Sequence, residues 1–229
     1  MNPTMLCALA TLLFLGMPSV AGAQAPPRDP VADAARVPPT IPLFPLGDVV
    51  LFPGVTRPLL IFEPRYRAMI ADALKGDRMI GMVLLRPGYE KDYEGRPPIY
   101  AVGCAGEIEE FELLPDGRYT IILRGITKVR VISEDQSRTY RLARVEAMPE
   151  RLADADMAPL SALRERLFTL LLQALPPNVD PPGPWLSDVE FVNVTAQFLA
   201  MPESTRQELL ERSGVLLRAQ GLLELLGPR

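Results

Sequence analysis

The sequence predicts an α+β protein in which a curled antiparallel β-sheet, or small barrel, is followed by a C-terminal helical bundle. Two observations lead to this fold class. Short apolar runs separated by turn signals follow one another over residues 41–148, as in small sheets and barrels. Over residues 149–229, leucines recur at helical spacing and prolines stand near the ends of the periodic segments. Strands followed by helices along one chain are typical of the α+β class.

The strands expected in the first half are short. The apolar runs at residues 41–46 and 49–52 contain or precede prolines, which suits edge or terminal strands because proline cannot donate to a ladder. A third run at residues 58–62 leads into a helix that begins at Glu63 and Pro64. Further strands are expected at residues 79–85, 99–114, 119–123, 126–132 and 140–147, with a hairpin turn at residues 115–117 and a break at Gly125.

The second half is expected to contain three helical segments. Asp156 is placed to cap a helix that ends at Leu175, before two prolines. A capping box that begins at Ser187 starts the next helix, and a second capping box begins at Ser204. The leucine-rich remainder of the chain is expected to be helical, with a break at Gly214.

Residues 1–23 have the pattern of a signal peptide. An apolar run at residues 5–17 is followed by small residues that would allow cleavage after Ala23. The run is shorter than the roughly 20 residues of a membrane span, so no stable span is expected after cleavage. A periplasmic or secreted location follows, with a cytoplasmic one as the alternative because no Lys or Arg precedes the run. Residues 24–40, rich in Ala, Pro, Arg and Asp without hydrophobic periodicity, are expected to be a linker.

The composition excludes several classes of function. Because the 229 residues include no histidine, Ser-His-Asp and Cys-His nucleophiles and His-based zinc sites are impossible. The formal net charge of -4 lacks the basic excess of most nucleic-acid binders. Cleavage after Ala23 would leave Cys104 as the single cysteine, and its apolar neighbours indicate a small buried side chain rather than a nucleophile. No catalytic residue, metal site or cofactor is therefore expected.

Six sequence blocks occur together in a recognisable order. They are Ile41-Pro-Leu-Phe-Pro-Leu-Gly-Asp-Val-Val-Leu-Phe-Pro-Gly54, Pro58-Leu-Leu-Ile-Phe-Glu-Pro-Arg-Tyr-Arg67, Val102-Gly-Cys-Ala-Gly-Glu-Ile108, Leu114-Pro-Asp-Gly-Arg-Tyr119, Leu123-Arg-Gly-Ile-Thr-Lys-Val-Arg-Val131 and Phe198-Leu-Ala-Met-Pro-Glu203. Together they resemble the N-terminal substrate-binding domain of the Lon protease family, especially small stand-alone bacterial proteins made of that domain.

The resemblance implies a PUA-like pseudo-barrel over residues 41–148 and a helical subdomain of the same region over residues 149–229. It also implies contact with unfolded or partner proteins and peptides. It does not extend to catalysis: no segment matches the Ser-Lys peptidase domain, and no lysine follows a glycine as in the ATPase phosphate loop. The expected function is a non-catalytic protein- or peptide-binding module. The alternative is a structural or regulatory subunit of an envelope protein complex or protease.

Four residues are candidates for contact with a peptide or partner. Arg65 and Tyr66 lie in the densest block of the resemblance, and Tyr89 and Tyr93 lie in a loop rich in Pro, Gly and Tyr. Aromatic side chains on loops are common in peptide contacts. The structural alternative is that Arg65 holds loops through hydrogen bonds and that the tyrosine loop has no role. Trp185, the single tryptophan, is expected to anchor the proline-rich connector onto the helices.

Two charged strips are expected on the strands. A basic strip on a sheet is one way to bind RNA, but the net charge and the 7% aromatic content favour two solvated faces that balance each other. The acidic strip also lacks the ligand spacing of a calcium loop. The basic strip comprises Arg118, Arg124, Lys128, Arg130, Arg138, Arg141 and Arg144, and the acidic strip comprises Glu107, Glu109, Glu110 and Glu112.

Overall fold

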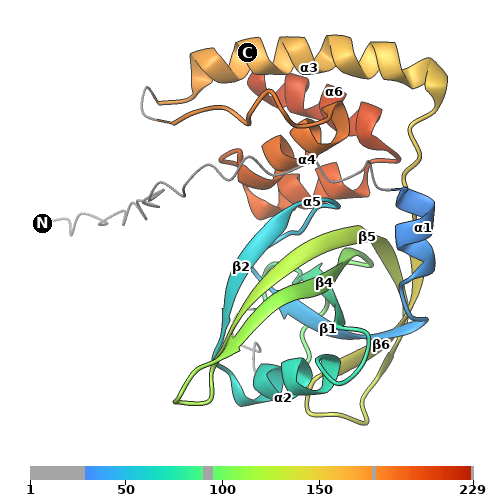
Figure 1. Cartoon of the computed structure of the whole chain (residues 1–229), viewed down its shortest axis with the longest axis vertical. Coiled ribbons are helices and arrows are strands. Elements are labelled where there is room, and N and C mark those ends of the chain that lie inside the picture. The colour runs from blue at the N-terminus through green and yellow to red at the C-terminus, as the bar shows by residue number, and fades with distance from the viewer. Residues whose placement is uncertain (1–28, 90–94, 177–178, 228–229) are drawn as a thin grey trace, which may run out of the picture.

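The computed structural model describes residues 29–89, 95–176 and 179–227, which form two lobes stacked one above the other (Figure 1). The barrel contains the strands together with helices α1 and α2, and the helical lobe contains α3 to α6. This order confirms the α+β fold class. The elements are α1 (Pro30–Ala35), β1 (Thr40–Leu46), β2 (Thr56–Ile61), α2 (Pro64–Ala73), β3 (Met79–Leu84), β4 (Val102–Leu113), β5 (Tyr119–Asp135), β6 (Arg141–Met148), α3 (Asp154–Ala174), α4 (Asp188–Phe198), α5 (Glu203–Glu211) and α6 (Val215–Leu226).

The six strands form one mixed sheet in the order β2-β5-β4-β3-β1-β6, and β5 also pairs with β6. The last pairing closes β5, β4, β3, β1 and β6 into a ring and leaves β2 outside it, paired with β5 alone. The prediction of an all-antiparallel sheet was wrong for one pair, because β1 and β3 run parallel, with Leu43 opposite Gly81. The chain between them contains β2 and α2, which is long enough for the crossover that a parallel pair requires. In the described part of the chain, one edge of β2 therefore carries no strand.

β5 is one continuous strand rather than the two strands that the sequence predicted on either side of Gly125. Gly125 does not interrupt the strand. Its N–H donates to the Val55 carbonyl at 2.9 Å, and its own carbonyl accepts from the Gly54 N–H at 2.8 Å. A Cβ on Gly125 would lie 2.1 Å from the Phe52 carbonyl oxygen. Glycine at this position therefore permits a close approach of two backbone segments and does not mark a break.

Residues 49–52 form no strand, although all four are buried as their apolar sequence suggests. Side chains of α4 form hydrogen bonds with the backbone groups that a neighbouring strand would otherwise bind. Gln197 accepts the Phe52 N–H at 3.2 Å and donates to the Val50 carbonyl at 2.6 Å. The Asn193 amide donates to the Pro53 carbonyl at 2.9 Å. The strand prediction failed because the partners are helical side chains about 145 residues further along the chain.

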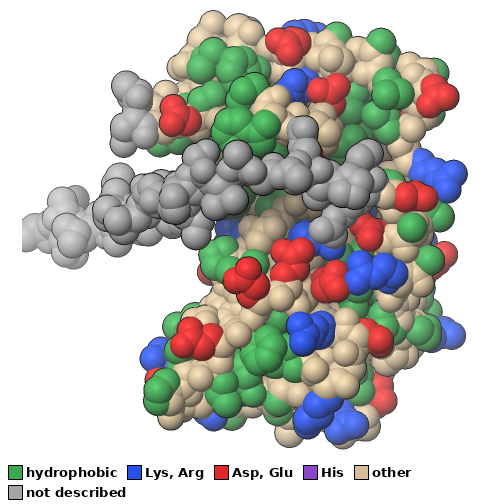
Figure 2. Space-filling view, in the orientation of Figure 1, with side chains coloured by type: hydrophobic (Ala, Val, Ile, Leu, Met, Phe, Trp, Pro, Cys, Tyr) green, Lys and Arg blue, Asp and Glu red, His purple; other side chains and the backbone are tan. Residues whose placement is uncertain are grey.

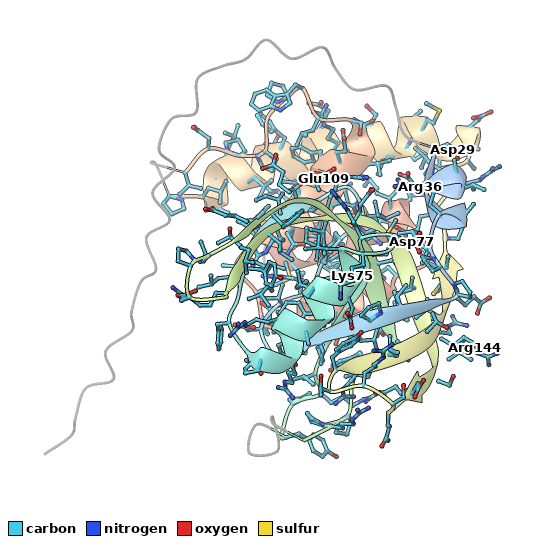
Figure 3. All side chains as sticks on the ribbon, turned by 60° about the horizontal axis from the view of Figure 1, so that its bottom comes forward. Asp29, Arg36, Lys75, Asp77, Glu109 and Arg144 are labelled. Atoms are coloured by element: carbon cyan, nitrogen blue, oxygen red, sulfur yellow. The ribbon has the colours of Figure 1, made fainter. Side chains whose placement is uncertain are left out.

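Part of the segment predicted as a linker, residues 24–40, is helical where the structure describes it. Asp29 accepts a hydrogen bond from the Val31 N–H at 2.9 Å and caps α1. At the other end of this helix, the Arg36 guanidinium lies 2.7 Å from the Glu107 carboxylate on β4. Figure 3 shows Asp29 and Arg36 beside α1. A cap and two ion pairs of Arg36 hold a helix that is too short to show hydrophobic periodicity, so the sequence pattern missed it.

Two of the predicted helix ends in the helical lobe are confirmed. The Ser187 side chain accepts from the Glu190 N–H, and the Glu190 carboxylate accepts from the Ser187 N–H, so the capping box of α4 is complete. Gly214 has a φ of 112° and separates α5 from α6. A non-glycine residue would be strained in that conformation, which explains why the leucine-rich segment breaks there.

Two other helix starts differ from the prediction. The second capping box was wrong, because Pro202 is the N-cap residue of α5 and Ser204 already lies in the first turn. Proline has no side-chain acceptor, so this helix begins without a side-chain cap. α3 begins at Asp154 with Ala153 as its N-cap, and Asp156 lies inside the first turn instead of capping it. The carboxylates of Asp154 and Asp156 both lie in the first turn of α3, at the positive end of the helix dipole.

The connector between α3 and α4 is held by Arg164, and the anchoring role predicted for Trp185 was wrong. Trp185 is 73% exposed, and its indole packs over Gly183 within the connector itself. The Arg164 side chain, from α3, donates to the carbonyls of Pro184 at 3.2 Å and Leu186 at 3.3 Å. The guanidinium offers several donors to the backbone of a loop, whereas the indole has only one.

The two lobes share an apolar core. Two clusters of buried side chains fill the barrel, and α2 supplies Tyr66, Met69 and Ile70 to one of them. A third cluster fills the helical lobe, but it also contains Phe52 and Leu84 from the barrel. The barrel and the helical lobe therefore pack as one unit rather than as two separable domains.

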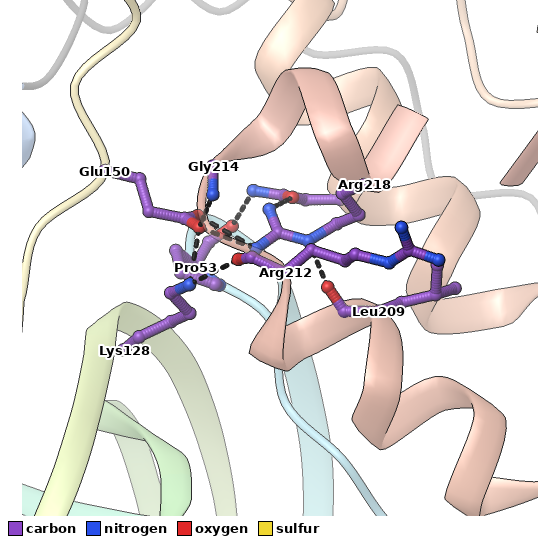
Figure 4. Close-up of polar contacts among 8 residues, drawn as sticks. Pro53, Lys128, Glu150, Leu209, Arg212, Gly214 and Arg218 are labelled. Atoms are coloured by element: carbon purple, nitrogen blue, oxygen red, sulfur yellow. Dashed lines mark hydrogen bonds and ion pairs between the residues drawn. The ribbon is translucent and has the colours of Figure 1, made fainter. Parts of the chain in front are cut away.

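A cluster of charged side chains, here called the lobe junction, also joins the two lobes (Figure 4). Glu150, between β6 and α3, lies 2.7 Å from the Lys128 ammonium of β5 and 2.9 Å from the Arg218 guanidinium of α6. Arg218 is fully buried and also donates to Asn193 Oδ1 at 2.6 Å. Lys128 donates to the Arg212 carbonyl at 2.8 Å. One carboxylate therefore compensates two buried cations that come from different lobes.

Candidate protein-binding groove

A groove of about 720 Å³ opens between the strand-free edge of β2, the ends of β1 and β3, and the start of α5. The groove lies beside β2 because this strand pairs with β5 alone. Its lining is mostly apolar and aromatic. It includes Phe44, Leu59, Leu60, Phe62, Tyr66 and Tyr100. An apolar groove beside an unpaired strand edge has the two features needed to bind a peptide in extended conformation.

Three apolar side chains on the groove remain exposed to solvent. They are Leu60 at 47%, Phe62 at 61% and Tyr89 at 47% exposure. In β2, Leu59 and Ile61 face the barrel core, so the alternation of a strand turns Leu60 outward. Phe62 follows immediately, between the end of β2 and the start of α2. Neighbouring exposed apolar side chains beside a groove are typical of binding surfaces.

Tyr66, predicted as a contact residue, lines the floor of the groove. It is only 3% exposed, its ring centroid lies 4.6 Å from that of Phe44, and its hydroxyl donates to the Pro45 carbonyl at 3.5 Å. The neighbouring Arg65 lies 2.9 Å from the Glu63 carboxylate, with its guanidinium 4.6 Å from the Tyr66 ring. Tyr66 therefore shapes the groove from below rather than projecting from the surface.

The four predicted contact residues do not all meet in one place. Tyr66 and Tyr89 both line the groove. Arg65 instead lines a neighbouring cavity of about 270 Å³, which Tyr66 also borders. Tyr93 lies outside the described residues. The structure thus brings two of the four residues to the groove and places Arg65 beside it.

Leu60 and Phe62 were not among the predicted contact residues. The apolar run at residues 58–62 predicts a strand but does not by itself show which side chains face outward. One signal was available: five consecutive apolar residues, Pro58 to Phe62, cannot all face inward in a strand whose side chains alternate. A proline within the run already indicated an edge strand. Together these features identify β2 as an exposed apolar edge.

The basic strip does not form a solvated face as predicted, because three of its members are buried in ion pairs. Arg124 lies 2.5 Å from Glu109, and Arg141 lies 2.9 Å from Glu134. Lys128 is part of the lobe junction. Figure 2 shows basic and acidic side chains intermixed over the front of the barrel, without a continuous basic surface on that face.

Two of the four glutamates in the acidic strip form ion pairs with arginines, and the other two do not in the part of the chain that the structure describes. Glu107 and Glu109 pair with Arg124, and Glu107 also pairs with Arg36. Burial acts to raise the pKa of Glu107, but the two guanidinium groups outweigh it and hold this pKa below its ordinary value. In contrast, Glu110 and Glu112 have no ion-pair partner among the described residues. They lie on the exposed part of β4.

Cys104 is a buried apolar side chain, as the sequence analysis expected. It has no solvent exposure, and burial raises the pKa of its thiol to about 12.

The thiolate of Cys104 is therefore absent at about pH 8, and we expect no alkylation of Cys104 by iodoacetamide in the native protein. Peptide mass mapping after brief treatment measures this result, and the same treatment in denaturant is the control. Rapid alkylation under native conditions would contradict the burial of this strand.

Within residues 29–89, 95–176 and 179–227, no helix combines the length and the apolar character needed to cross a membrane. In the same residues, no group of three or more acidic or cysteine side chains is arranged to hold a metal ion.

The chain is similar to the N-terminal region of Lon proteases. It is 27% identical to the Lon protease of Anaeromyxobacter dehalogenans over 219 residues, which cover 90% of this chain and 25% of that protein. It is 30% identical to Lon protease 1 of Bdellovibrio bacteriovorus over 195 residues, which cover 80% of this chain and 24% of that protein. The chain therefore spans about a quarter of the length of these Lon proteases.

Two solved structures have a similar fold. The Lon N-terminal domain protein from Xanthomonas campestris is 26% identical, with a TM-score of 0.56 over 81% of this chain and 97% of that one. The N-terminal domain of the Mycobacterium avium complex Lon protease has a TM-score of 0.61 at 17% identity, over 82% and 97% of the two chains. The model of the family described as the ATP-dependent protease La (LON) substrate-binding domain matches residues 40–227. The chain therefore belongs to the Lon substrate-binding domain family.

Proposed function

We propose that this protein is a non-catalytic binding module that holds unfolded or partner proteins and peptides in the groove beside β2. The observation that carries the proposal is the exposed apolar edge of β2, where Leu60 and Phe62 border a groove of about 720 Å³. Membership of the Lon substrate-binding domain family supports a protein as the ligand. The matched region is that domain, which supports a binding rather than a catalytic role.

The groove supports two kinds of contact with an extended segment. Backbone groups of the segment can pair with the open edge of β2, which gives affinity for many sequences. Apolar side chains of the segment can contact Leu60, Phe62 and Tyr89, which are about half exposed. Because full burial of such a side chain contributes about 2 kcal/mol, these contacts favour weak and reversible binding. Weak binding of many sequences suits a module that meets unfolded clients.

We expect Leu60→Ser/Phe62→Ser to weaken the binding of an unfolded client about tenfold or more. Both side chains already face solvent, so their replacement removes the apolar contact without opening the core. Fluorescence anisotropy of a labelled, permanently unfolded protein measures the affinity, and thermal melting shows whether the fold is kept.

The matched control is Leu172→Ser, which removes a 57% exposed leucine from α3 in the helical lobe. This variant is expected to bind the client as the unmodified protein does. If the unmodified protein shows no saturable binding, or if the β2 variant binds as well as the control, the groove is not the client site.

The second candidate function is that of a structural or regulatory subunit of an envelope protein complex or protease. The exposed side chains of Trp185 and Leu172 favour it, because both belong to the helical lobe and neither lines the groove. Cross-linking in cells distinguishes the two functions. A single dominant cross-linked product supports a dedicated partner, and a broad distribution of products supports a client-binding module.

We also propose that the protein is exported to the periplasm or secreted. The support is the apolar run at residues 5–17 with small residues before the expected cleavage site at Ala23. Residues 1–23 lie outside the described residues. We expect the intact mass of the protein from the periplasmic fraction of its host to lack these 23 residues. A full-length protein in the cytosolic fraction would contradict export and make cytosolic proteins the candidate partners.

A further inference from the structure

We propose that the groove selects extended apolar segments that carry lysine or arginine side chains. This inference rests on the proposed function, because it concerns the ligand of the same groove. It is derived from the carboxylates that border the exposed apolar residues of β2 on both sides.

The charged side chains that line the groove leave two carboxylates facing it. Besides Asp48 and Glu203, the lining contains Glu63, which is paired with Arg65, and Arg86. Arg86 keeps its positive charge, but its guanidinium is held beside the end of β3, where it donates to the Ile99 carbonyl at 3.3 Å and lies 4.9 Å from the Tyr100 ring. Asp48 is exposed and has no ion-pair partner among the described residues.

Glu203, at the start of α5, is only partly compensated. One carboxylate oxygen lies 3.4 Å from the Arg206 guanidinium, and the other is buried without a hydrogen-bond partner. Burial raises the pKa of Glu203, and the charge of Asp48 raises it further, while Arg206 and Arg57 act in the opposite direction. A cation held in the groove would relieve this cost by adding a favourable charge beside both carboxylates.

A second pair of carboxylates lies on β4, which β5 separates from β2. A shallow depression of about 500 Å³ is lined there by Pro58, Leu60, Ile122, Glu110 and Glu112. The strand register explains this arrangement. Glu110 lies opposite Ile122, which lies opposite Pro58, and Glu112 lies opposite Thr120, which lies opposite Leu60. Residues directly opposite one another project to the same face, so each row across the sheet begins on β2 and ends at a carboxylate.

Leu60 joins the two surfaces, because it lines both the groove and the outer depression. A segment that lies along β2 therefore has Asp48 and Glu203 on one side and Glu110 and Glu112 on the other. Such a surface attracts basic residues and repels acidic ones, which gives selectivity in addition to apolar contact.

The test compares three labelled peptides of equal length that share the same apolar residues. The intervening positions are all Lys, all Gln or all Glu. At an ionic strength of about 0.02 M, we expect the Lys peptide to bind about tenfold more tightly than the Gln peptide, and the Glu peptide to bind more weakly than both. At about 0.5 M salt the three affinities should converge, because the charges are screened.

Two double variants test the residue assignment. Asp48→Asn/Glu203→Gln and Glu110→Gln/Glu112→Gln should each bring the Lys peptide closer to the Gln peptide without changing the affinity of the Gln peptide. The control is Glu146→Gln/Glu165→Gln, which changes the net charge equally at exposed positions on β6 and α3. The control should keep the full preference for lysine, because net charge alone does not create it.

The outcomes separate this inference from the proposed function. Equal binding of the Lys and Glu peptides at low salt overturns the selectivity but leaves the groove as a peptide site. A lysine preference that is unchanged in both double variants overturns the assignment to these four carboxylates. If none of the three peptides binds, and the unfolded client does not bind either, the proposed function fails as well.

Discussion

Glu150→Gln is expected to lower the free energy of unfolding by about 4 kcal/mol, because it removes the charge that compensates two buried cations. Lys128 is 2% and Arg218 0% exposed, so neither can turn to solvent when the carboxylate is lost. Glu150 also accepts a hydrogen bond from the Gly214 N–H at 3.2 Å. The substitution keeps the shape of the side chain, and chemical denaturation monitored by circular dichroism measures the loss.

A second substitution checks the explanation. In the Glu150→Gln background, Lys128→Met removes one of the two uncompensated cations and should recover part of the lost stability. Glu165→Gln, the same chemical change at an exposed position on α3, should change the free energy of unfolding by less than about 0.5 kcal/mol. If Glu150→Gln behaved like Glu165→Gln, the lobe junction would not hold the two lobes together.

Gly125→Ala is expected to destabilise the protein by about 3 kcal/mol or more, because the added methyl group has no space. Its carbon would lie 2.1 Å from the Phe52 carbonyl oxygen and 3.3 Å from the Cys104 sulfur. The Phe52 backbone cannot easily move away, since its N–H is bound by Gln197 of α4. Thermal melting measures the loss, and native alkylation of Cys104 in this variant would show whether the strand has opened.

Gly47→Ala provides the matched control. A Cβ on Gly47 would have no atom within 4 Å, so the same methyl group should be tolerated. Replacing glycine by alanine at a compatible site commonly leaves stability unchanged or raises it by about 0.5 kcal/mol. A small effect at both positions would mean that the backbone near Phe52 can adjust, and that the close approach at Gly125 is not essential.

The features that the sequence predicted correctly depend on nearby residues. The capping box at Ser187 and Glu190 and the break at Gly214 are local, and the continuous apolar run at residues 79–85 matches β3, which is buried throughout. The features that it missed have distant partners. The parallel pairing of β1 with β3 and the capping of residues 49–52 by Gln197 depend on residues that only the folded chain brings together.

The candidate site shows the same limit. Sequence reasoning placed Tyr66 and Tyr89 in a contact region, and both line the groove. It did not identify Leu60 and Phe62, because an apolar residue in a strand is more often buried than exposed. It also could not anticipate that Arg124 would be buried, since the carboxylates that pair with it come from the neighbouring strand.

The attachment of residues 49–53 to α4 determines when during synthesis the protein can become stable. These residues leave the ribosome long before Gln197, which lies 145 residues after Phe52. Until α4 is made, the buried backbone groups of Val50 and Phe52 lack the partners found in the native state. Such long-range contacts slow folding, because a large loop must close before the contact forms. The native hydrogen bonds of residues 50–53 can therefore form only after α4 has been synthesised.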